Sequence, residues 1–457
     1  MQIDEKPKNP ENHAFIDNPN RTLIVLSIPV LFSLIAEPIT GLIDTAFIAQ
    51  LGSVPLAALG VGTVALSSTF WIFNFLGIGA QTEVAQALGN QNREGAVKAS
   101  SLALALSILF GLGMFIIGAP LATVIARLLG AEGAVLTDAT AYIQVRLFAA
   151  PAVLITFTGF GVLRGMQDMQ TPLWIAITIN VINIVLDAPF IYGFGMIPAL
   201  GVAGSALATV IAQWVGVAMT LWMIGRHLGY TRDIHFADAV KLMKIGGDLF
   251  IRTGSLTFFI LLATSVATRI GVDSGASHQA IRQVWFFSTL TMEAFAVTAQ
   301  SLVGYFVGAT AIRYARRVSA YCTVWSIGTG VVLAILMLLS TDLVIAAFVP
   351  ESAVAVFMPA WIVASVSQPL SAVAFVTDGI HWGTGDYRYM RNGMIIATLI
   401  ASISLFLIDT TANNALVYVW LGTVLWIALR SIWGIVRVFP GVGDAPIGAE
   451  KVQASPA

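Results

Sequence analysis

The sequence predicts an all-α membrane protein with twelve transmembrane helices, and two properties of its 457 residues support this fold class. Hydrophobic residues make up 57% of the chain and charged residues only 10%, whereas an ordinary soluble domain carries about 25% charged residues. Apolar runs long enough to cross about 30 Å of hydrocarbon recur along the whole length. These runs are continuous rather than alternating, which excludes a transmembrane β-barrel.

Each apolar run is expected to form one transmembrane helix. The twelve runs cover roughly residues 23–48, 56–88, 97–126, 139–163, 171–194, 201–225, 243–269, 278–308, 318–348, 355–382, 390–408 and 415–436. The first twenty residues are polar, so we expect no signal peptide and a first helix that acts as its own insertion signal.

The distribution of positive charges supports the helix count and gives the orientation. With a cytoplasmic amino terminus, the two outside positions are Arg127 and Arg269. The seventeen inside positions are Lys6, Lys8, Arg21, Arg93, Lys98, Arg164, Arg226, Arg232, Lys241, Lys244, Arg313, Arg316, Arg317, Arg388, Arg391, Arg437 and Lys451. Such a bias indicates that both termini are cytoplasmic.

The chain contains an internal repeat. Shifted by 218 residues, 151–168 aligns with 369–386, and shifted by 219, 52–89 aligns with 271–308. The shift spans six predicted helices, so both halves enter the membrane in the same orientation, as in a two-bundle transporter. The predicted parts are a cytoplasmic tail 1–21, an N-lobe 22–226, a loop 227–242, a C-lobe 243–438 and a disordered tail 439–457.

Several classes of function are excluded or disfavoured. The single cysteine, Cys322, rules out an internal disulfide and a cysteine-cluster metal site, and the five histidines show no metal-ligand spacing. No P-loop motif is present, so any pumping must use an ion gradient or a separate subunit. No nucleophile–base arrangement is evident, and we expect neither an enzyme nor a cofactor other than H⁺ or Na⁺ as coupling ion.

Two aspartates, Asp44 and Asp187, lie inside these apolar runs. An ionised carboxylate at the bilayer centre costs at least about 2.5 kcal/mol, so such residues indicate an ion, proton or substrate site. Asn180, Asn183 and Asp187 share one helical face and could hold a carboxylate or complete an oxygen cage for a cation. If this face meets Asp44, the two carboxylates repel and could share a proton. A structural hydrogen-bonded pair is the alternative.

The repeat bears on this choice, because Asp44 aligns with Ala263 and Asp187 with about Leu405. Acids present in one half only favour function, although divergence would also explain them. Pro29 and Pro38 interrupt the same helix as Asp44. They either permit a bend that follows the charge on Asp44 or are ordinary transmembrane prolines.

The second half carries its own embedded charges. They are Asp248, Arg252, Arg282, Glu293, Asp378 and Arg430. Neutralising ion pairs are the first interpretation of these residues, and an anion site at Arg252 or Arg430 is the second. Glu37 and Glu83 are not assigned a role, and the charged turn with Arg164 and Asp168 is interpreted as structural.

These motifs resemble a known family. The segments GLIDTAFIAQLGS, GVLRGMQDMQTP and NVINIVLDAPF, in a six-plus-six repeat, resemble the multidrug and toxic compound extrusion (MATE) transporters over roughly residues 22–437. The second half, with DLFIRTGSL, AFVTDGIHWGTGD and ALRSIW, is more similar to the DinF-type branch than to the NorM branch.

The resemblance implies two lobes around a central cleft and exchange of H⁺ or Na⁺ for organic cations by alternating access. It also implies an N-lobe cation site. The residues carried over are the acid Asp44, the pair Asn183 and Asp187, the neighbouring Asn180, the hydroxyl of Thr209 or Ser205, and the bending residue Pro29.

One position departs from the pattern. The NorM-branch acid of the tenth helix would fall near Ser371, whereas Asp378 follows about two turns later, so a second-lobe Na⁺ site is disfavoured. Secondary charges of that lobe are Arg252, Glu293, Asp378 and Arg430. Relatives in plants include exporters of organic acids such as citrate, which keeps anionic substrates open.

The hypothesis is a multi-pass, monomeric secondary efflux transporter of the cell inner (plasma) membrane. Its partners are a small-molecule substrate and the lipid bilayer, and no nucleic acid is expected. One alternative is an organic-acid exporter of the same branch. A lipid or polysaccharide flippase would be expected to carry a cationic cavity, whereas the N-lobe candidates here are acidic. A membrane enzyme or a passive channel is disfavoured.

Overall fold

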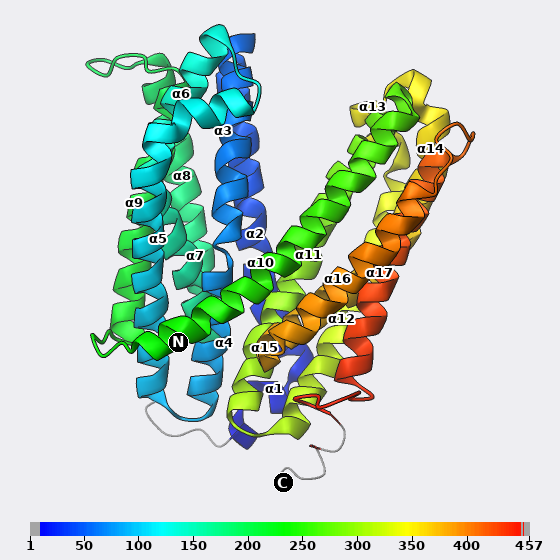
Figure 1. Cartoon of the computed structure of the whole chain (residues 1–457). Helices are drawn as coiled ribbons and strands as arrows, with labels where there is room; N and C mark the ends of the chain where they lie inside the picture. Colours follow the sequence, from blue (N-terminus) through cyan, green and yellow to red (C-terminus); the bar gives the residue numbers. More distant parts are fainter. Residues whose placement is uncertain (1–9, 449–450, 452–457) are drawn as a thin grey trace. The chain divides into compact units, whose positions relative to one another are not determined.

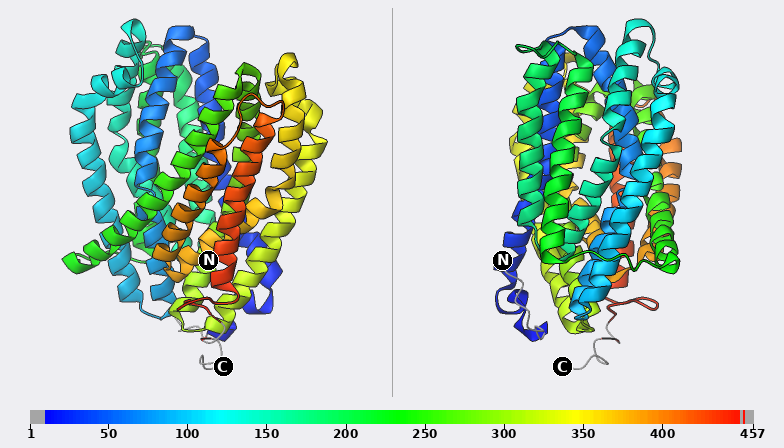
Figure 2. Two further views of the ribbon diagram at one scale, coloured as in Figure 1. Left: turned by 45° about the vertical axis from the view of Figure 1, so that its right-hand side comes forward. Right: turned by 90° about the vertical axis from the view of Figure 1, so that its left-hand side faces the viewer.

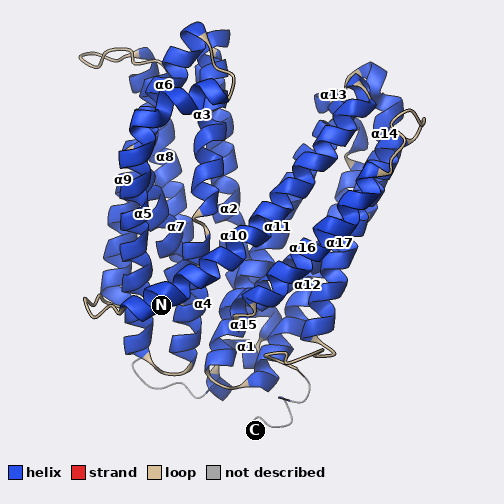
Figure 3. Ribbon diagram, viewed as in Figure 1, coloured by secondary structure: helices blue, strands red, loops and turns tan. Residues whose placement is uncertain are grey.

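The computed structural model describes residues 10–448 and 451, and within them the fold is built from helices without a strand (Figures 1, 2 and 3). The α-helices up to the ninth are α1 Ala14–Asp17, α2 Pro19–Ala49, α3 Ser53–Ile72, α4 Phe75–Gly89, α5 Arg93–Leu128, α6 Gly133–Leu147, α7 Ala150–Gly165, α8 Gln170–Tyr192 and α9 Val202–His227. The others are α10 Phe236–Ile270, α11 Val272–Gly308, α12 Ile312–Leu339, α13 Thr341–Phe348, α14 Val354–Val366, α15 Gln368–Thr384, α16 Tyr387–Phe406 and α17 Ala415–Val438. The short 3₁₀ helices are η1 Pro10–Asn12 and η2 Glu351–Ala353.

The number of membrane spans agrees with the prediction. Ten spans of the described chain are long and apolar enough to cross a bilayer, and two bent helix pairs raise the number to twelve. The bent pairs are α6 with α7, at 51°, and η2–α14 with α15, at 46°. Predicted as single helices, these two spans break where Pro151 and Pro369 begin the second helix of each pair. Proline is favoured there because the first turn of a helix does not use its missing N–H group.

Contacts within the chain define two compact units. The first unit is Ile28–Gly246, and the second contains the described residues up to Ser27 together with those from Gly247 onward. The boundary between the two units, at Gly246, lies just after the predicted loop 227–242. Residues 22–27, predicted to belong to the N-lobe, group instead with the second unit. The reason is that Leu23 is buried with Phe306, and the Ser27 hydroxyl donates to Thr298 Oγ1 at 3.0 Å.

The repeat is present in the closest helix contacts of each unit. A Cβ atom added to Gly161 would lie 2.1 Å from the carbonyl oxygen of Gly77, and one added to Gly379 would lie 2.1 Å from that of Ala296. One turn later, Gly165 and Gly383 each place the added atom 2.7 Å from the carbonyl oxygen of a glutamine. Glycine is therefore required where α7 crosses α4 and where α15 crosses α11.

The charged turn after α7 is structural in this fold. Asp168 accepts hydrogen bonds from the backbone N–H (3.0 Å) and hydroxyl (2.6 Å) of Thr171, at the start of α8. Its repeat equivalent, Asp386, accepts a hydrogen bond from Arg437 Nε at 2.8 Å. Arg164 Nη2 donates to Ser33 Oγ of α2 at 3.2 Å. Asp168 and Asp386 lie just before α8 and α16, and Arg164 lies in the last turn of α7, so these contacts fix helix ends.

The two terminal segments differ from their predicted states. The chain is helical from α1, and α2 begins at Pro19 rather than at residue 23. Residues 439–448, predicted to be disordered, pack on the second unit with Ile447 only 2% exposed. Arg316 Nη1 donates to the Ile447 carbonyl (3.2 Å) and Arg437 Nη2 to that of Asp444 (3.0 Å). These bonds satisfy two backbone carbonyl groups of the segment and hold it in place, which the sequence alone does not show. Residues 449–450 and 452–457 lie outside the described residues.

The helix crossing gives a stability prediction. We expect Gly379→Ala to destabilise the protein by about 1–3 kcal/mol, because the new methyl group must displace backbone of α11. Thermal unfolding of the purified protein in detergent measures this. The control is Gly254→Ala in α10, where an added Cβ meets no atom within 4 Å and alanine favours the helix by up to about 1 kcal/mol. Equal melting temperatures for the two variants would contradict the account.

Candidate functional site

The candidate site is in the first unit, where α2, α8 and α9 contribute polar side chains. Asn183 and Asp187 lie one turn apart on α8 and are 1% and 0% exposed. Because α8 packs along α9 (Figure 1), this face of α8 also meets Thr209. Asp44 of α2 is partly buried. The structure thus brings together four of the residues that the sequence singles out.

Asn183 connects the helices. In the amide orientation that satisfies both of its polar groups, Asn183 Nδ2 donates to Asp44 Oδ1 at 3.1 Å. Its Oδ1 then accepts from the backbone N–H of Thr209 at 3.3 Å. The Thr209 hydroxyl donates to the Ser205 carbonyl at 3.0 Å. One amide therefore holds Asp44 against two other helices of the first unit.

The carboxyl groups of Asp44 and Asp187 face each other within hydrogen-bonding reach. Neither oxygen of the buried Asp187 accepts a hydrogen bond from any donor in the described chain. Two ionised carboxylates at this distance repel strongly in an apolar environment. A proton on one of them converts the repulsion into a hydrogen bond, and a small cation between them would neutralise it. The arrangement therefore needs one positive charge.

The remaining residues that the family resemblance implies are Asn180, Ser205 and Pro29. Asn180 is partly buried one turn before Asn183 on α8. Ser205 is fully buried with a hydroxyl that lacks a partner among the described residues, so Thr209 rather than Ser205 meets the amide. Pro29 is buried in α2, which continues as one helix through Pro29 and Pro38. The end of this helix is held to α8, because the Tyr192 hydroxyl donates to the Phe47 carbonyl at 2.7 Å.

Sequence reasoning missed one residue beside this site, Arg146. It lies in the last turn of α6, and its charge interacts with both Asp44 and Glu37 of α2. Its signal was present in the sequence, because Arg146 stands inside the apolar run 139–163 as Asp44 and Asp187 stand inside theirs. The same rule that identifies buried acids identifies this base.

The embedded charges of the second unit pair with one another. Arg252 and Arg430 both donate to Oδ2 of Asp378, the latter at 2.8 Å, and the two arginine residues are 9% and 6% exposed. The Arg430 guanidinium also lies 4.5 Å from the ring centre of Trp426, and the charge of Glu293 reaches it. Asp378, held by two cations, is poorly placed to exchange a proton.

The remaining second-unit charges lie elsewhere. Asp248 pairs with Arg391 at 2.5 Å, and Arg282 donates to the Gln279 side chain at 3.0 and 3.2 Å. In the first unit, Glu83 pairs with Lys241 at 2.8 Å. Among the described residues, no group of three or more His, Cys, Asp or Glu side chains is arranged to hold a metal ion.

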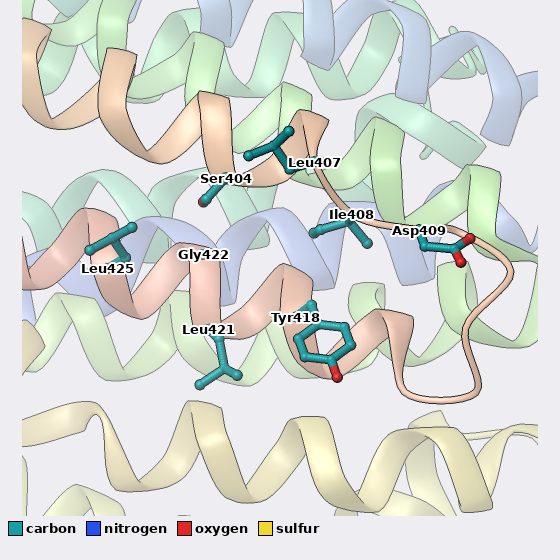
Figure 4. A pocket seen from close by; sticks show the side chains of 8 residues that line it. All are labelled: Ser404, Leu407, Ile408, Asp409, Tyr418, Leu421, Gly422 and Leu425. Carbon is teal, nitrogen blue, oxygen red and sulfur yellow. The ribbon is translucent and has the colours of Figure 1, made fainter.

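A separate groove opens at the α16–α17 connection of the second unit (Figure 4). It has a volume of about 400 Å³ and is lined by Ser404, Leu407, Ile408, Asp409, Tyr418, Leu421, Gly422 and Leu425. The hydroxyl and backbone N–H of Thr411 donate to Asp409 and hold the pKa of that carboxyl below its usual range. The apolar walls of this groove are typical of a surface that faces lipid.

Comparison with known proteins identifies the family. The MatE family model matches residues 29–188 and 251–407, which include Asp44, Asn183 and Asp187 of the first unit and Arg252 and Asp378 of the second. The chain belongs to the MatE family. It is accordingly a multi-pass membrane protein of the multidrug and toxic compound efflux type, and the family predicted from its motifs is confirmed.

Relatives of this MatE protein include DETOXIFICATION and DinF proteins. It is 28% identical over 437 residues to the chloroplastic Protein DETOXIFICATION 44 of Arabidopsis thaliana, covering 91% of this chain and 81% of the relative. It is 27% identical over 434 residues to the DNA damage-inducible protein F of Escherichia coli, covering 92% of both chains. The resemblance to the DinF-type branch is thereby confirmed.

Solved structures share the fold. A crystal structure of MATE in the bent conformation has a TM-score of 0.83 at 22% identity, and one in the straight conformation has a TM-score of 0.82 at 22% identity. Each covers 92% of this chain and 96% of the solved chain. The twelve-helix architecture of this MatE protein is therefore that of the family.

The second-unit cluster gives a prediction. We expect Asp378→Asn to lower stability by about 3–5 kcal/mol, because it leaves two buried guanidinium groups without their shared carboxylate. Thermal unfolding in detergent is the measurement. Asp409→Asn, on the exposed α16–α17 connection, serves as the control and should lower the melting temperature far less, because the asparagine oxygen can still accept from Thr411. An unaltered melting temperature for Asp378→Asn would show that the cluster is not an ion-paired core.

Proposed function

We propose that this MatE protein is a proton-coupled exporter of organic cations and that Asp44 and Asp187 form its coupling pair. The observation that carries the proposal is the contact of two carboxyl groups of which one, Asp187, is fully buried without a donor. The pair needs one positive charge. A proton and a cationic substrate can both supply it, and they cannot do so at once.

Competition of this kind produces exchange. When the pair binds a proton in one conformation and a cationic substrate in another, each ligand stabilises its own state, and the two fluxes are coupled. A proton satisfies the pair with a single hydrogen bond. A sodium ion needs several oxygen ligands, and it is the alternative that the transport assay tests.

The first helix is the proposed moving part. Pro29 and Pro38 each remove a backbone hydrogen bond from α2, which makes bending at these positions less costly. Asn183 ties Asp44 to α8 and α9, so a change of charge on Asp44 changes what holds the end of α2. The relatives crystallised in bent and straight conformations support a conformational change within this fold.

Organic-acid export is the second candidate function. It is supported by Arg252 and Arg430, whose Nε atoms lack hydrogen-bond partners among the described residues. The Asp378 carboxylate already forms ion pairs with both guanidinium groups. An anionic substrate would have to compete with it, and this favours the cation exporter. In either case we propose a monomer in the inner (plasma) membrane with both termini in the cytoplasm.

Transport in proteoliposomes tests the proposal. We expect ethidium to move under an imposed pH gradient but not under a Na⁺ gradient, and Asp44→Asn to reduce that movement at least about tenfold, since the variant cannot bind the coupling proton. Asp409→Asn, with its carboxyl outside the first unit, is the matched control and should transport normally.

Two outcomes would contradict this proposal. Normal proton-driven transport by Asp44→Asn would remove Asp44 from coupling. No ethidium movement under either gradient would refute the cation substrate, and citrate transport by wild type but not by Arg252→Gln would then establish the second candidate.

A further inference from the structure

Arg146 is a partly buried cation whose side chain has two buried nitrogen atoms without a partner among the described residues. It lies just before the 51° bend between α6 and α7. Its Nε and Nη1 atoms are buried and have no hydrogen-bond partner in the described chain. Leaving guanidinium donors unpaired inside a protein is costly. A carboxylate that became available nearby would therefore bind this side chain.

Such carboxylates are at hand on α2. The charge of Arg146 interacts with Glu37 and with Asp44, which are seven residues apart and therefore on one face of the helix. At 1.5 Å per residue these two positions are about 10 Å apart along the axis. The guanidinium group thus lies along this face within the influence of both, and Asp187 faces Asp44 from α8.

No other charge of the described first unit competes for this position. The α6 helix packs against α3, α5 and α9, and α3 carries no charged residue. The charged residues of α5 and α9 lie in the first two turns or the last turn of these helices, and they are Arg93, Glu94, Lys98, Arg127 and Arg226. In α6 the other charged residue is Asp138, two turns before Arg146. Glu37 and Asp44 are therefore the two acids whose charges interact with the Arg146 guanidinium group.

We propose that Arg146 is the internal counter-charge of the coupling pair, which binds Asp44 when the pair loses its proton and is displaced when a cationic substrate arrives. This positioning role rests on the proposed function. It explains why two nitrogen atoms of the guanidinium group have no partner: in the deprotonated pair, the Asp44 carboxylate would accept hydrogen bonds from them. Arg146 thereby prevents an empty, doubly negative site during the return of the transporter.

The proposal fixes the sign of two effects. A nearby positive charge favours ionised carboxyl groups, so Arg146 lets the pair release its proton at a lower pH. The same charge opposes a cationic ligand at Asp44. Replacing Arg146 by a neutral residue should therefore move proton release to higher pH and tighten cation binding once the proton is gone.

The experiment measures ethidium binding to the purified full-length protein in detergent as a function of pH. Ethidium keeps its positive charge at every pH, so the pH dependence of binding reports the titration of groups on the protein. For Arg146→Gln we expect the midpoint of binding to rise by about one pH unit or more and affinity at the alkaline plateau to rise roughly fivefold or more. Arg146→Lys keeps the charge and should restore a near-wild-type profile.

Glu37→Gln gives an independent test of opposite sign, which also serves if Arg146→Gln does not fold. Without the carboxylate of Glu37, Arg146 acts on Asp44 alone and a repulsive charge is gone, so the midpoint should move to lower pH. A wild-type midpoint in either folded neutral variant would overturn the role of Arg146 while leaving the coupling pair intact. Ethidium binding by wild type that does not depend on pH would instead refute the proposed function, and this inference with it.

Discussion

The contact between Asp44 and Asp187 is the interaction on which this account depends. Two carboxyl groups in an apolar environment cannot both be ionised without a compensating charge. The structure surrounds them with few donors, since Asn183 supplies one hydrogen bond to Asp44 and Asp187 receives none from the described residues. The site is therefore poised between binding a proton and binding another cation, which is the requirement for exchange.

The two units use one scaffold for different purposes. Glycines at equivalent positions allow the same helix crossings in both, so the repeat is a property of packing. The buried charges do not follow it. The first unit has an acid pair with an unsatisfied arginine nearby, whereas the second unit encloses Asp378 between two guanidinium groups. Charge that is already paired resists titration, and we therefore place coupling in the first unit.

Much of this could be predicted from the sequence, because hydrophobic run length determines spans and a buried acid is conspicuous in an apolar run. The pairing of Asp44 with Asp187 needed only the assumption that their helix faces meet. Other features depended on tertiary contacts. Leu23 groups with the second unit because of what it packs against, and Ile447 is ordered because Arg316 reaches its carbonyl group. Arg146 stands in the fourth apolar run, but only the fold shows that its charge interacts with the acids of α2.

Infrared spectroscopy of the purified protein tests the shared proton most directly. A protonated carboxyl group absorbs apart from a carboxylate, so a titration around neutral pH can detect a proton held by the pair. The account predicts a protonated-carboxyl band at neutral pH that is lost or shifted in both Asp44→Asn and Asp187→Asn and kept in Asp409→Asn. Loss of the band in neither aspartate variant, or its absence from the wild-type protein, would contradict the central claim.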